Sequence, residues 1–477
     1  MTNTAKSALL TDLYQITMAQ GFYHNDKAEV EACYYLFFRD YPFNGGYAIA
    51  CGMAQIADYV QNFNFDNEDI EYLRNLNMFA EDFLQYLSEL KLKVNIDCVL
   101  EGSIVFPQEP VLRVSGPILH CQLIETAILN AFNFQTLVAT KASRVMSAAQ
   151  CPVMEFGLRR AQGYSGGVWA SRAAIVGGCS STSDVEAGRQ FNIPVAGTHA
   201  HSWVMAFENE LDAFRAYAKE FANNCVLLVD TYDIEQGVKN AITVGLEMKE
   251  RGQHLAGIRI DSGDLTWVSK SARKMLDEAG LTDCGIVLSN DLDEYSIKSI
   301  KNEGGSFTNL GVGTKLATAY DQAALGGVYK LAAIKKNGQW QGIMKISETS
   351  EKMTIPGFLN VRRYVDKYSK LAGDMIYDVF DGVEDVQIIV DPKDNLRRKQ
   401  LAGNDYYDLL MPMFKDGKLV MDDFDTMTAQ TRAKEGLATL DETQKRTLNP
   451  HTYPVGLEHS LNRKRTKLVA KIRGVKL

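Results

Sequence analysis

Two histidines stand two positions apart in the segment Gly197-Thr198-His199-Ala200-His201-Ser202. A neutral imidazole nitrogen can act as a base, as a metal ligand or as the acceptor of a phosphoryl group. Asp230 and Asp261 follow later apolar runs, and such acids can orient an imidazole and stabilise its charged form. Taken alone, the segment fits equally well a histidine that only satisfies a buried hydrogen bond.

A second candidate is the segment Arg259-Ile260-Asp261-Ser262-Gly263-Asp264. An arginine at a strand end can bind a carboxylate through two hydrogen bonds, and nearby carboxylates can hold a magnesium ion or a ribose hydroxyl. A helix cap formed by Asp261 or Ser262 is the alternative, but it leaves Arg259 unexplained inside an apolar run. We therefore favour a binding role for Arg259.

A third candidate is the segment Gly311-Val312-Gly313-Thr314-Lys315, which offers backbone N–H groups and a hydroxyl at a strand-to-helix turn. This arrangement is typical of phosphate sites. Cations that suit a diphosphate stand elsewhere, at Lys141, Arg144, Arg159 and Arg160. For Lys141 and Arg144 an ordinary surface charge is an equally good interpretation.

Short apolar runs recur from about residue 150 onward, and the last four are spaced at roughly the length of one strand-helix unit. Between two of them, Ile234, Val238, Ala241, Ile242 and Gly245 fall on one face at helical spacing, which predicts a crossover helix. The even spacing favours a closed barrel over an open sheet. The predicted strands are 153–156, 193–196, 226–229, 256–260, 286–288 and 310–312.

Each of these runs ends in polar or glycine-rich residues, and the three candidate segments are among them. Enzymes built on such barrels place their chemistry in the loops that follow the carboxyl ends of the strands. A random distribution of loop residues would not keep this phase. The sequence therefore predicts one site at the strand ends.

The two ends of the chain differ from this pattern. Residues 31–38 and a hairpin within 97–114 predict a small α/β domain at the N-terminus, where Leu10 to Gln15 begins a capped helix. A further hairpin turning at Asn337-Gly338 is expected to rejoin it. The predicted domains are 1–115, a catalytic barrel over 116–326, and a C-terminal part, 327–477, that ends in a charged helical tail.

Composition limits the class of protein. Hydrophobic residues make up 46% and charged residues 23% of the chain, which is ordinary globular usage. A net charge of −8 argues against a nucleic-acid partner, and the absence of a long apolar stretch or signal peptide argues against a membrane. The eight cysteines lack zinc-site spacing. We expect a cytoplasmic protein with structural thiols.

Together these segments resemble the nicotinate phosphoribosyltransferase family, a branch of the type II phosphoribosyltransferases. The resemblance implies an irregular (β/α) barrel with a smaller α/β domain formed by the N-terminal and C-terminal parts. It is carried, in family order, by 10–14, 155–163, 197–202, 261–264 and 311–314.

The family's reaction implies that nicotinate displaces diphosphate from 5-phosphoribosyl 1-diphosphate, with Mg²⁺ present, to give nicotinate mononucleotide for NAD salvage. ATP hydrolysis is coupled to it through a phosphohistidine, which matches His201, whereas His199 is secondary. Asp230 matches the acid that supports this histidine, and Asp261 is the acid expected near the ribose. The magnesium ligands stay unassigned.

The resemblance also assigns the binding residues. Phe156 and Tyr14 are similar to the two faces of an aromatic sandwich for the pyridine ring, with Tyr14 coming from the other subunit of a homodimer. The active sites would then lie at the subunit interface. Arg259 matches the residue facing the ring substituent, with Thr198 beside it. The phosphate and diphosphate contacts match Arg159, Lys141, Gly313 and Thr314.

Three other interpretations compete with this one. The nicotinamide-specific relative and the quinolinate enzyme share the barrel but use other substrates. A catalytically idle barrel that serves as a binding protein is the third. Polar residues follow every predicted strand, which argues against a catalytically idle barrel. The residues after Phe156-Gly157 and the turn from Thr198 to Ser202 favour nicotinate as the substrate.

Overall fold

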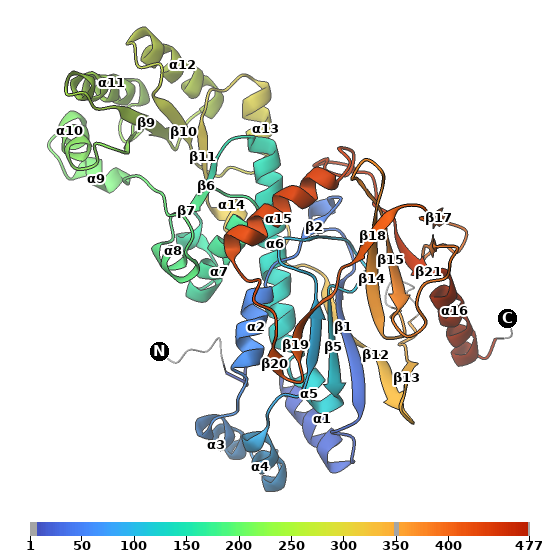
Figure 1. Cartoon of the computed structure of the whole chain (residues 1–477). Coiled ribbons are helices and arrows are strands. Elements are labelled where there is room, and N and C mark those ends of the chain that lie inside the picture. Colours follow the sequence, from blue (N-terminus) through green and yellow to red (C-terminus); the bar gives the residue numbers. More distant parts are fainter. Residues whose placement is uncertain (1–6, 348–352, 476–477) are drawn as a thin grey trace. The chain divides into compact units, whose positions relative to one another are not determined.

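The computed structural model of the chain (Figure 1) describes residues 7–347 and 353–475, which fall into two compact units. One unit joins both ends of the chain, Met1–Leu137 with Ala324–Leu477, and the other is Val138–Ala323. Helix α6, Glu125–Ala149, runs across the first boundary. No helix in the described ranges combines the length and apolar character of a membrane span.

The central unit contains a parallel sheet that carries the predicted strand-helix repeats. Its strands lie in the order β7-β6-β11-β10-β9-β8, and every pairing between them is parallel. The described residues contain no pairing of β7 with β8, so the sheet is a half-barrel. The strands are β6 Val153–Glu155, β7 Ser181–Thr182, β8 Cys225–Leu228, β9 Leu255–Ile260, β10 Gly285–Leu288 and β11 Asn309–Val312.

Helices alternate with these strands, and α10, α11 and α12 pack against β8, β9 and β10 (Figure 1). The predicted crossover helix is α11, Ile234–Glu250, capped by the Asp233 side chain, which accepts the Gln236 N–H. The other helices of this unit are η3 Leu158–Arg160, α7 Tyr164–Val176, α8 Val185–Phe191, α9 His201–Met205, α10 Glu210–Glu220, α12 Leu265–Glu278, α13 Glu294–Asn302 and α14 Thr314–Ala317.

One predicted barrel strand is wrong. Residues 193–196 contribute only an isolated bridge from Val195 to Thr182, and the strand beside β6 is β7. Ser181 and Thr182 lack the apolar character that marks the other strands, yet both are buried, and the Thr182 hydroxyl donates to Glu155 at 2.6 Å. The polar sequence hid this strand.

The unit that joins both chain ends contains two larger sheets. The first has the order β13-β12-β1-β5-β3-β19-β20, and β12 pairs antiparallel with β1, so the chain rejoins its N-terminal part as predicted. The hairpin turn lies at Asn337 and Gly338, both with positive φ. The strands are β1 Glu31–Phe38, β3 Asn95–Cys98, β5 Leu112–Pro117, β12 Gly327–Lys336, β13 Gln339–Gly342, β19 Met411–Lys415 and β20 Lys418–Leu419.

The second sheet, of order β17-β16-β21-β15-β14-β18, was not predicted. With this sheet, the unit that joins both chain ends is the larger of the two units, whereas the sequence predicted that it would be the smaller. Its strands are β14 Leu359–Val365, β15 Leu371–Asp378, β16 Ile388–Val390, β17 Arg398–Gln400, β18 Asp405–Asp408 and β21 Val455–Glu458.

The remaining elements of this unit are helical, apart from the short pair β2 Ala48–Ile49 and β4 Ile104–Val105. The charged tail forms α16, His459–Arg473, as predicted. The other helices are α1 Leu13–His24, η2 Pro42–Asn44, α2 Met53–Gln61, α3 Asn67–Asn75, α4 Glu81–Glu89, α5 Ile118–Leu123 and α15 Thr426–Thr439.

A buried ionic cluster anchors the second sheet. Arg363 on β14 donates to Asp374 on β15 at 3.0 and 2.6 Å, and both side chains are almost fully buried. Tyr453 donates to the same carboxylate at 2.9 Å. Burial, together with Asp374, raises the pKa of the neighbouring Glu109 well above its usual range. Asp374 therefore carries the charge that balances Arg363.

Replacing Arg363 with methionine should destabilise this unit by about 3–5 kcal/mol, because Asp374 would remain buried without its cation. Denaturant-induced unfolding of the variant measures the loss. The control is Arg74→Met, which removes a surface arginine paired with Glu71 and Glu81 and should change stability little. Equal, small losses in both variants would contradict the assigned role of Arg363.

Candidate functional site

A cavity of about 310 Å³ opens at the carboxyl ends of the parallel strands in the central unit. Its walls come from the loops that follow β6, β9, β10 and β11 and from the segment around Thr198. Seven residues selected from the sequence line it: Phe156, Arg159, Thr198, Arg259, Asp261, Gly313 and Thr314. The prediction that these side chains meet at one edge of the sheet is confirmed.

Arg259 is the centre of the polar wall. Its side chain is only 13% exposed, and it donates from Nε to Ser289 Oγ at 2.8 Å, from Nη1 to Thr198 Oγ1 at 3.1 Å and from Nη2 to Asp261 Oδ1 at 3.0 Å. These partners come from three different loops. The arginine inside an apolar run is thus explained by the polar groups gathered around its guanidinium.

Phe156 forms the apolar wall beside this cation. The Arg259 guanidinium carbon lies 5.4 Å from the centre of the Phe156 ring, a favourable cation–π distance. The ring packs on Gly311, where an added Cβ would lie 2.5 Å from Phe156 Cε2. Glycine at 311 is required because the ring occupies the space of a side chain.

Glu155 holds the turn that presents Phe156. Its buried carboxylate accepts hydrogen bonds from the Gly157 N–H, from Ser171 Oγ at 2.8 Å and from Thr182 Oγ1 at 2.6 Å. Burial raises the pKa of Glu155 above its usual range, whereas these bonds oppose the rise. The carboxylate therefore ties β6, β7 and α7 together beneath the cavity.

Arg159 and Arg160 follow Phe156 in η3, and both are exposed at the cavity. Neither guanidinium has an ion-pair partner among the described residues, so both remain available to an anion. Gly313 and Thr314 face the same space from the start of α14. Lys315 in α14 pairs with Asp293 at 2.7 Å and so ties α14 to the start of α13.

Lys141 does not line the cavity. It is fully buried and pairs with Glu294 at 2.7 Å and with Asp321 at 2.5 Å. Arg144 donates to the same Glu294 carboxylate at 2.7 Å. In this arrangement Lys141 supports the beginning of α13, next to the loop 289–291, and its contact with diphosphate stays a prediction.

The two histidines of the opening segment have different surroundings. His199 is 8% exposed, and its Nε2 accepts the Leu228 N–H at 3.2 Å while Nδ1 lies 3.3 Å from the Ala200 carbonyl. The proton of the neutral ring therefore resides on Nδ1. Burial lowers the pKa of His199, and Arg259 and His201 lower it further. His199 is a structural histidine that also borders the cavity.

His201 begins α9 and is only partly buried. Its Nδ1 lies 3.2 Å from Thr231 Oγ1, whereas Nε2 has no hydrogen bond to any residue in the described part of the chain. Neither a hydrogen bond nor an ion pair joins Asp230 to His201. Its Oδ2 accepts the Asp261 N–H at 3.0 Å and Ser262 Oγ at 2.6 Å, and its buried Oδ1 has no partner there.

Tyr14 lies in α1 of the other unit, where its side chain is 49% exposed. Burial of part of the phenol, together with Glu125 and Asp12, raises the pKa of Tyr14.

The cysteines are reduced thiols, and seven of the eight are buried, as expected. Ser183 and Ser289 also line the cavity. Ser183 follows β7, the strand that was not predicted because its sequence is polar.

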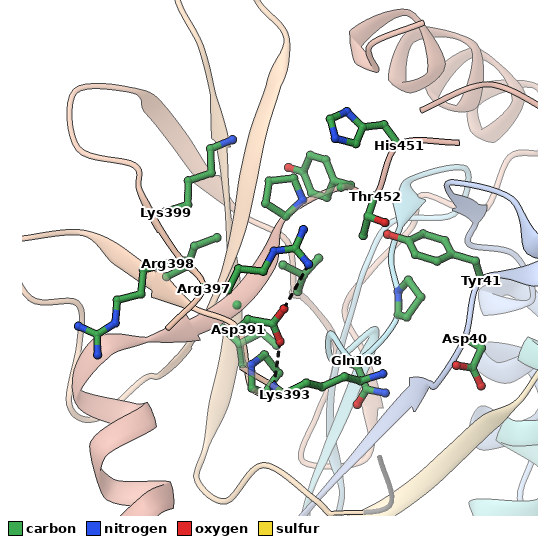
Figure 2. A pocket seen from close by; sticks show the side chains of 18 of the residues that line it. Asp40, Tyr41, Gln108, Asp391, Lys393, Arg397, Arg398, Lys399, His451 and Thr452 are labelled. Atoms are coloured by element: carbon green, nitrogen blue, oxygen red, sulfur yellow. Dashed lines mark hydrogen bonds and ion pairs between the residues drawn. The ribbon is translucent and has the colours of Figure 1, made fainter. Parts of the chain in front are cut away.

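A second cavity, of about 580 Å³, lies in the unit formed by both chain ends (Figure 2). It is rich in cations, and three of them have partners within the chain. Arg397 pairs with Asp391 at 3.7 Å, Lys399 donates to the Ala372 carbonyl at 2.7 Å, and Arg398 donates to the Asn395 carbonyl at 3.0 Å. We assign no chemistry to this larger cavity.

Comparison with known proteins decides the family. Family models described as the N-terminal domain, the family proper and the C-terminal domain of nicotinate phosphoribosyltransferase match residues 9–133, 151–367 and 360–465. A nicotinate phosphoribosyltransferase of Bacillus subtilis is 42% identical over 455 residues, which cover 94% of this chain and 92% of the relative. The chain belongs to the nicotinate phosphoribosyltransferase family.

Two further comparisons agree with this assignment. The human nicotinate phosphoribosyltransferase is 35% identical over 412 residues, covering 74% of this chain and 76% of the relative. The crystal structure of human nicotinic acid phosphoribosyltransferase superposes with a TM-score of 0.84 at 29% identity, over 96% of this chain and 99% of that one. The predicted family and its fold are confirmed.

The neutral state of His199 predicts a pH dependence of stability. Folding lowers the pKa of His199. The stability that neutral His199 contributes is therefore complete above the pKa of the unfolded chain, about 6.5, and is lost as the pH falls below that value. Denaturant unfolding of wild type and His199→Gln between pH 8 and pH 5 tests this. The stability difference should shrink toward acid pH, and a constant difference would contradict the prediction.

Proposed function

We propose that this chain transfers the phosphoribosyl group of 5-phosphoribosyl 1-diphosphate to the ring nitrogen of nicotinate and releases diphosphate. The product would be nicotinate mononucleotide, a precursor in NAD salvage. The observation that supports this most is the cation of Arg259 beside the ring of Phe156 in the strand-end cavity. A flat aromatic acid needs both groups, one for the ring and one for the carboxylate.

The rest of the cavity suits the other substrate. As the C1–oxygen bond to diphosphate breaks and the C1–nitrogen bond forms, the ribosyl carbon gains positive charge and the leaving group gains negative charge. Asp261 can stabilise the first, and the unpaired Arg159 and Arg160 can bind the second. Gly313 and Thr314 add a backbone turn and a hydroxyl for a phosphate.

Magnesium is expected to enter with the diphosphate. The described residues contain no cluster of three or more side chains that could hold a metal by themselves. Mg²⁺ in such sites is usually held by one or two carboxylates and by substrate phosphates, and Asp261 and Asp291 lie at the cavity for this purpose. The bound ion would neutralise charge on the leaving diphosphate.

ATP would act through His201. Its Nε2 has no partner in the described ranges, and Thr231 can accept the proton on Nδ1, so Nε2 presents a lone pair. Attack on the γ-phosphorus forms a nitrogen–phosphorus bond, breaks the bond to the β-phosphate oxygen and releases ADP. Asp230 would act on this histidine through the loop it shares with Thr231. The phosphoryl group then goes to water.

The ring would be covered on its second face by Tyr14 of a partner subunit, because the family implies a homodimer with shared active sites. The exposed phenol of Tyr14 is available for such a contact. We also expect the enzyme in the cytoplasm, as the sequence predicts. Nicotinamide is the less favoured substrate, because an uncharged amide gains less than a carboxylate from Arg259.

A diphosphate-release assay tests the proposed activity. Purified protein should release diphosphate from 5-phosphoribosyl 1-diphosphate with nicotinate, faster with ATP, and much more slowly with nicotinamide. Preference for nicotinamide would establish the nicotinamide-specific alternative. Binding of nicotinate without any turnover would establish an idle barrel instead.

Replacing His201 with alanine should abolish ATP stimulation but leave slow, ATP-independent formation of nicotinate mononucleotide, because the residues around Arg259 stay in place. Incubation with γ-labelled ATP, followed by mapping of acid-labile phosphate, measures the modification directly. The matched control is His199→Gln, which should still be labelled. Labelling that persists in the His201 variant would refute the assignment.

A further inference from the structure

We propose that Ser289 is a positioning residue that keeps Arg259 able to bind a carboxylate, by preventing Asp261 from forming a two-pronged ion pair with it. This inference rests on the proposed function, since it concerns how the same site selects nicotinate over nicotinamide. It assigns a role to a serine that lies outside the segments carrying the family resemblance.

The guanidinium geometry identifies the contact that matters. Nε–H and one N–H of Nη2 point from the same edge of an arginine and fit the two oxygens of one carboxylate. In this structure that edge is shared, because Ser289 takes Nε–H at 2.8 Å and Asp261 takes Nη2–H at 3.0 Å. Asp261 is thereby limited to a single hydrogen bond with Arg259.

Ser289 itself is held firmly. It directly follows β10, is only 2% exposed, and its N–H donates to the Ile260 carbonyl at 3.0 Å. Its hydroxyl accepts from Arg259 and donates to Asp261 Oδ1 at 2.5 Å. The hydroxyl therefore has one acceptor and one donor partner, and these two bonds set the distance between the cation and the acid.

Two N–H groups of Arg259 remain available to a substrate. Thr198 uses one N–H of Nη1, so one N–H on Nη1 and one on Nη2 have no acceptor among the described residues. Asp261 Oδ2 likewise has no hydrogen bond within the described ranges. The cavity thus retains donors for a substrate carboxylate and an acceptor for the ribose.

Removing the Ser289 hydroxyl would free the Nε–H of Arg259, so that Asp261 could bond to both N–H groups on that edge of the guanidinium. Asp261 is two residues from Arg259 and is already bonded to it, so its carboxylate can take both N–H groups without a long movement. A two-pronged pair would neutralise the guanidinium more fully and withdraw Oδ2 from the cavity. The binding of an anionic ring would suffer more than that of a neutral one.

Calorimetric titration of the full-length protein with nicotinate and with nicotinamide tests the proposal. Ser289→Ala should weaken nicotinate binding by about tenfold or more, since a hydrogen bond to a charged group is at stake. Nicotinamide binding should change much less. The control Ser269→Ala removes another fully buried hydroxyl that also makes two hydrogen bonds, distant from the cavity, and should leave both affinities unchanged.

Steady-state assays give a second readout. In Ser289→Ala the KM for nicotinate should rise, whereas the KM for nicotinamide should change much less. Ser289→Cys, which keeps the volume but has only a weak donor, should move nicotinate affinity in the same direction and serves if the alanine variant fails to fold. Equal loss of both pyridine ligands, or no loss of either, would overturn the proposal.

The result also separates this inference from the proposed function. Wild-type protein that shows no turnover, but whose selective nicotinate binding depends on Ser289, would refute the enzyme and support the positioning role. Active wild-type protein with an unaffected Ser289→Ala variant would support the enzyme and refute that role.

Discussion

The candidate site depends on one electrostatic constraint, which is that a largely buried guanidinium must be stabilised without being neutralised. Arg259 is 13% exposed, so its charge requires nearby acceptors. A single carboxylate bonded through both oxygens would neutralise more of its charge and so weaken its attraction for an anionic substrate. The structure instead distributes the acceptors over two hydroxyls and one carboxylate oxygen.

The parallel sheet is what makes this distribution possible. Asp261 and Ser289 meet because the neighbouring parallel strands β9 and β10 place their carboxyl ends at one edge, and Thr198 reaches the same edge from the segment after the isolated bridge at Val195. Buried polar groups below the cavity hold these loops. Glu155 ties the turn at Gly157, after Phe156, to β7 and α7, and Lys315 ties α14 to Asp293. Rigid support of this kind keeps a binding geometry fixed before the ligand arrives.

Much of this could be predicted from the sequence, because the signals were local. The apolar runs and the polar residues after them located five of the six parallel strands and seven of the cavity residues. The hairpin at Asn337-Gly338 followed from turn chemistry alone. Family resemblance added the roles of His201 and Tyr14, which no periodicity contains.

The features that escaped prediction depend on pairing between distant residues. β7 is polar yet buried, with the Thr182 hydroxyl bonded to Glu155, and the sequence could not show that Lys141 is buried between Glu294 and Asp321. The second sheet of the unit with both chain ends assembles strands far apart in sequence around Arg363 and Asp374. In the sequence, Ser289 is only a polar residue after a predicted strand. Its hydrogen bonds to both Arg259 and Asp261 depend on the folded structure.

A crystal structure of the protein with nicotinate bound tests the central claim most directly. The account predicts that the ring lies against Phe156, that the carboxylate accepts hydrogen bonds from the free N–H groups of Arg259, and that Ser289 still separates Nε from Asp261. A ring bound elsewhere, or a carboxylate turned away from Arg259, would contradict it.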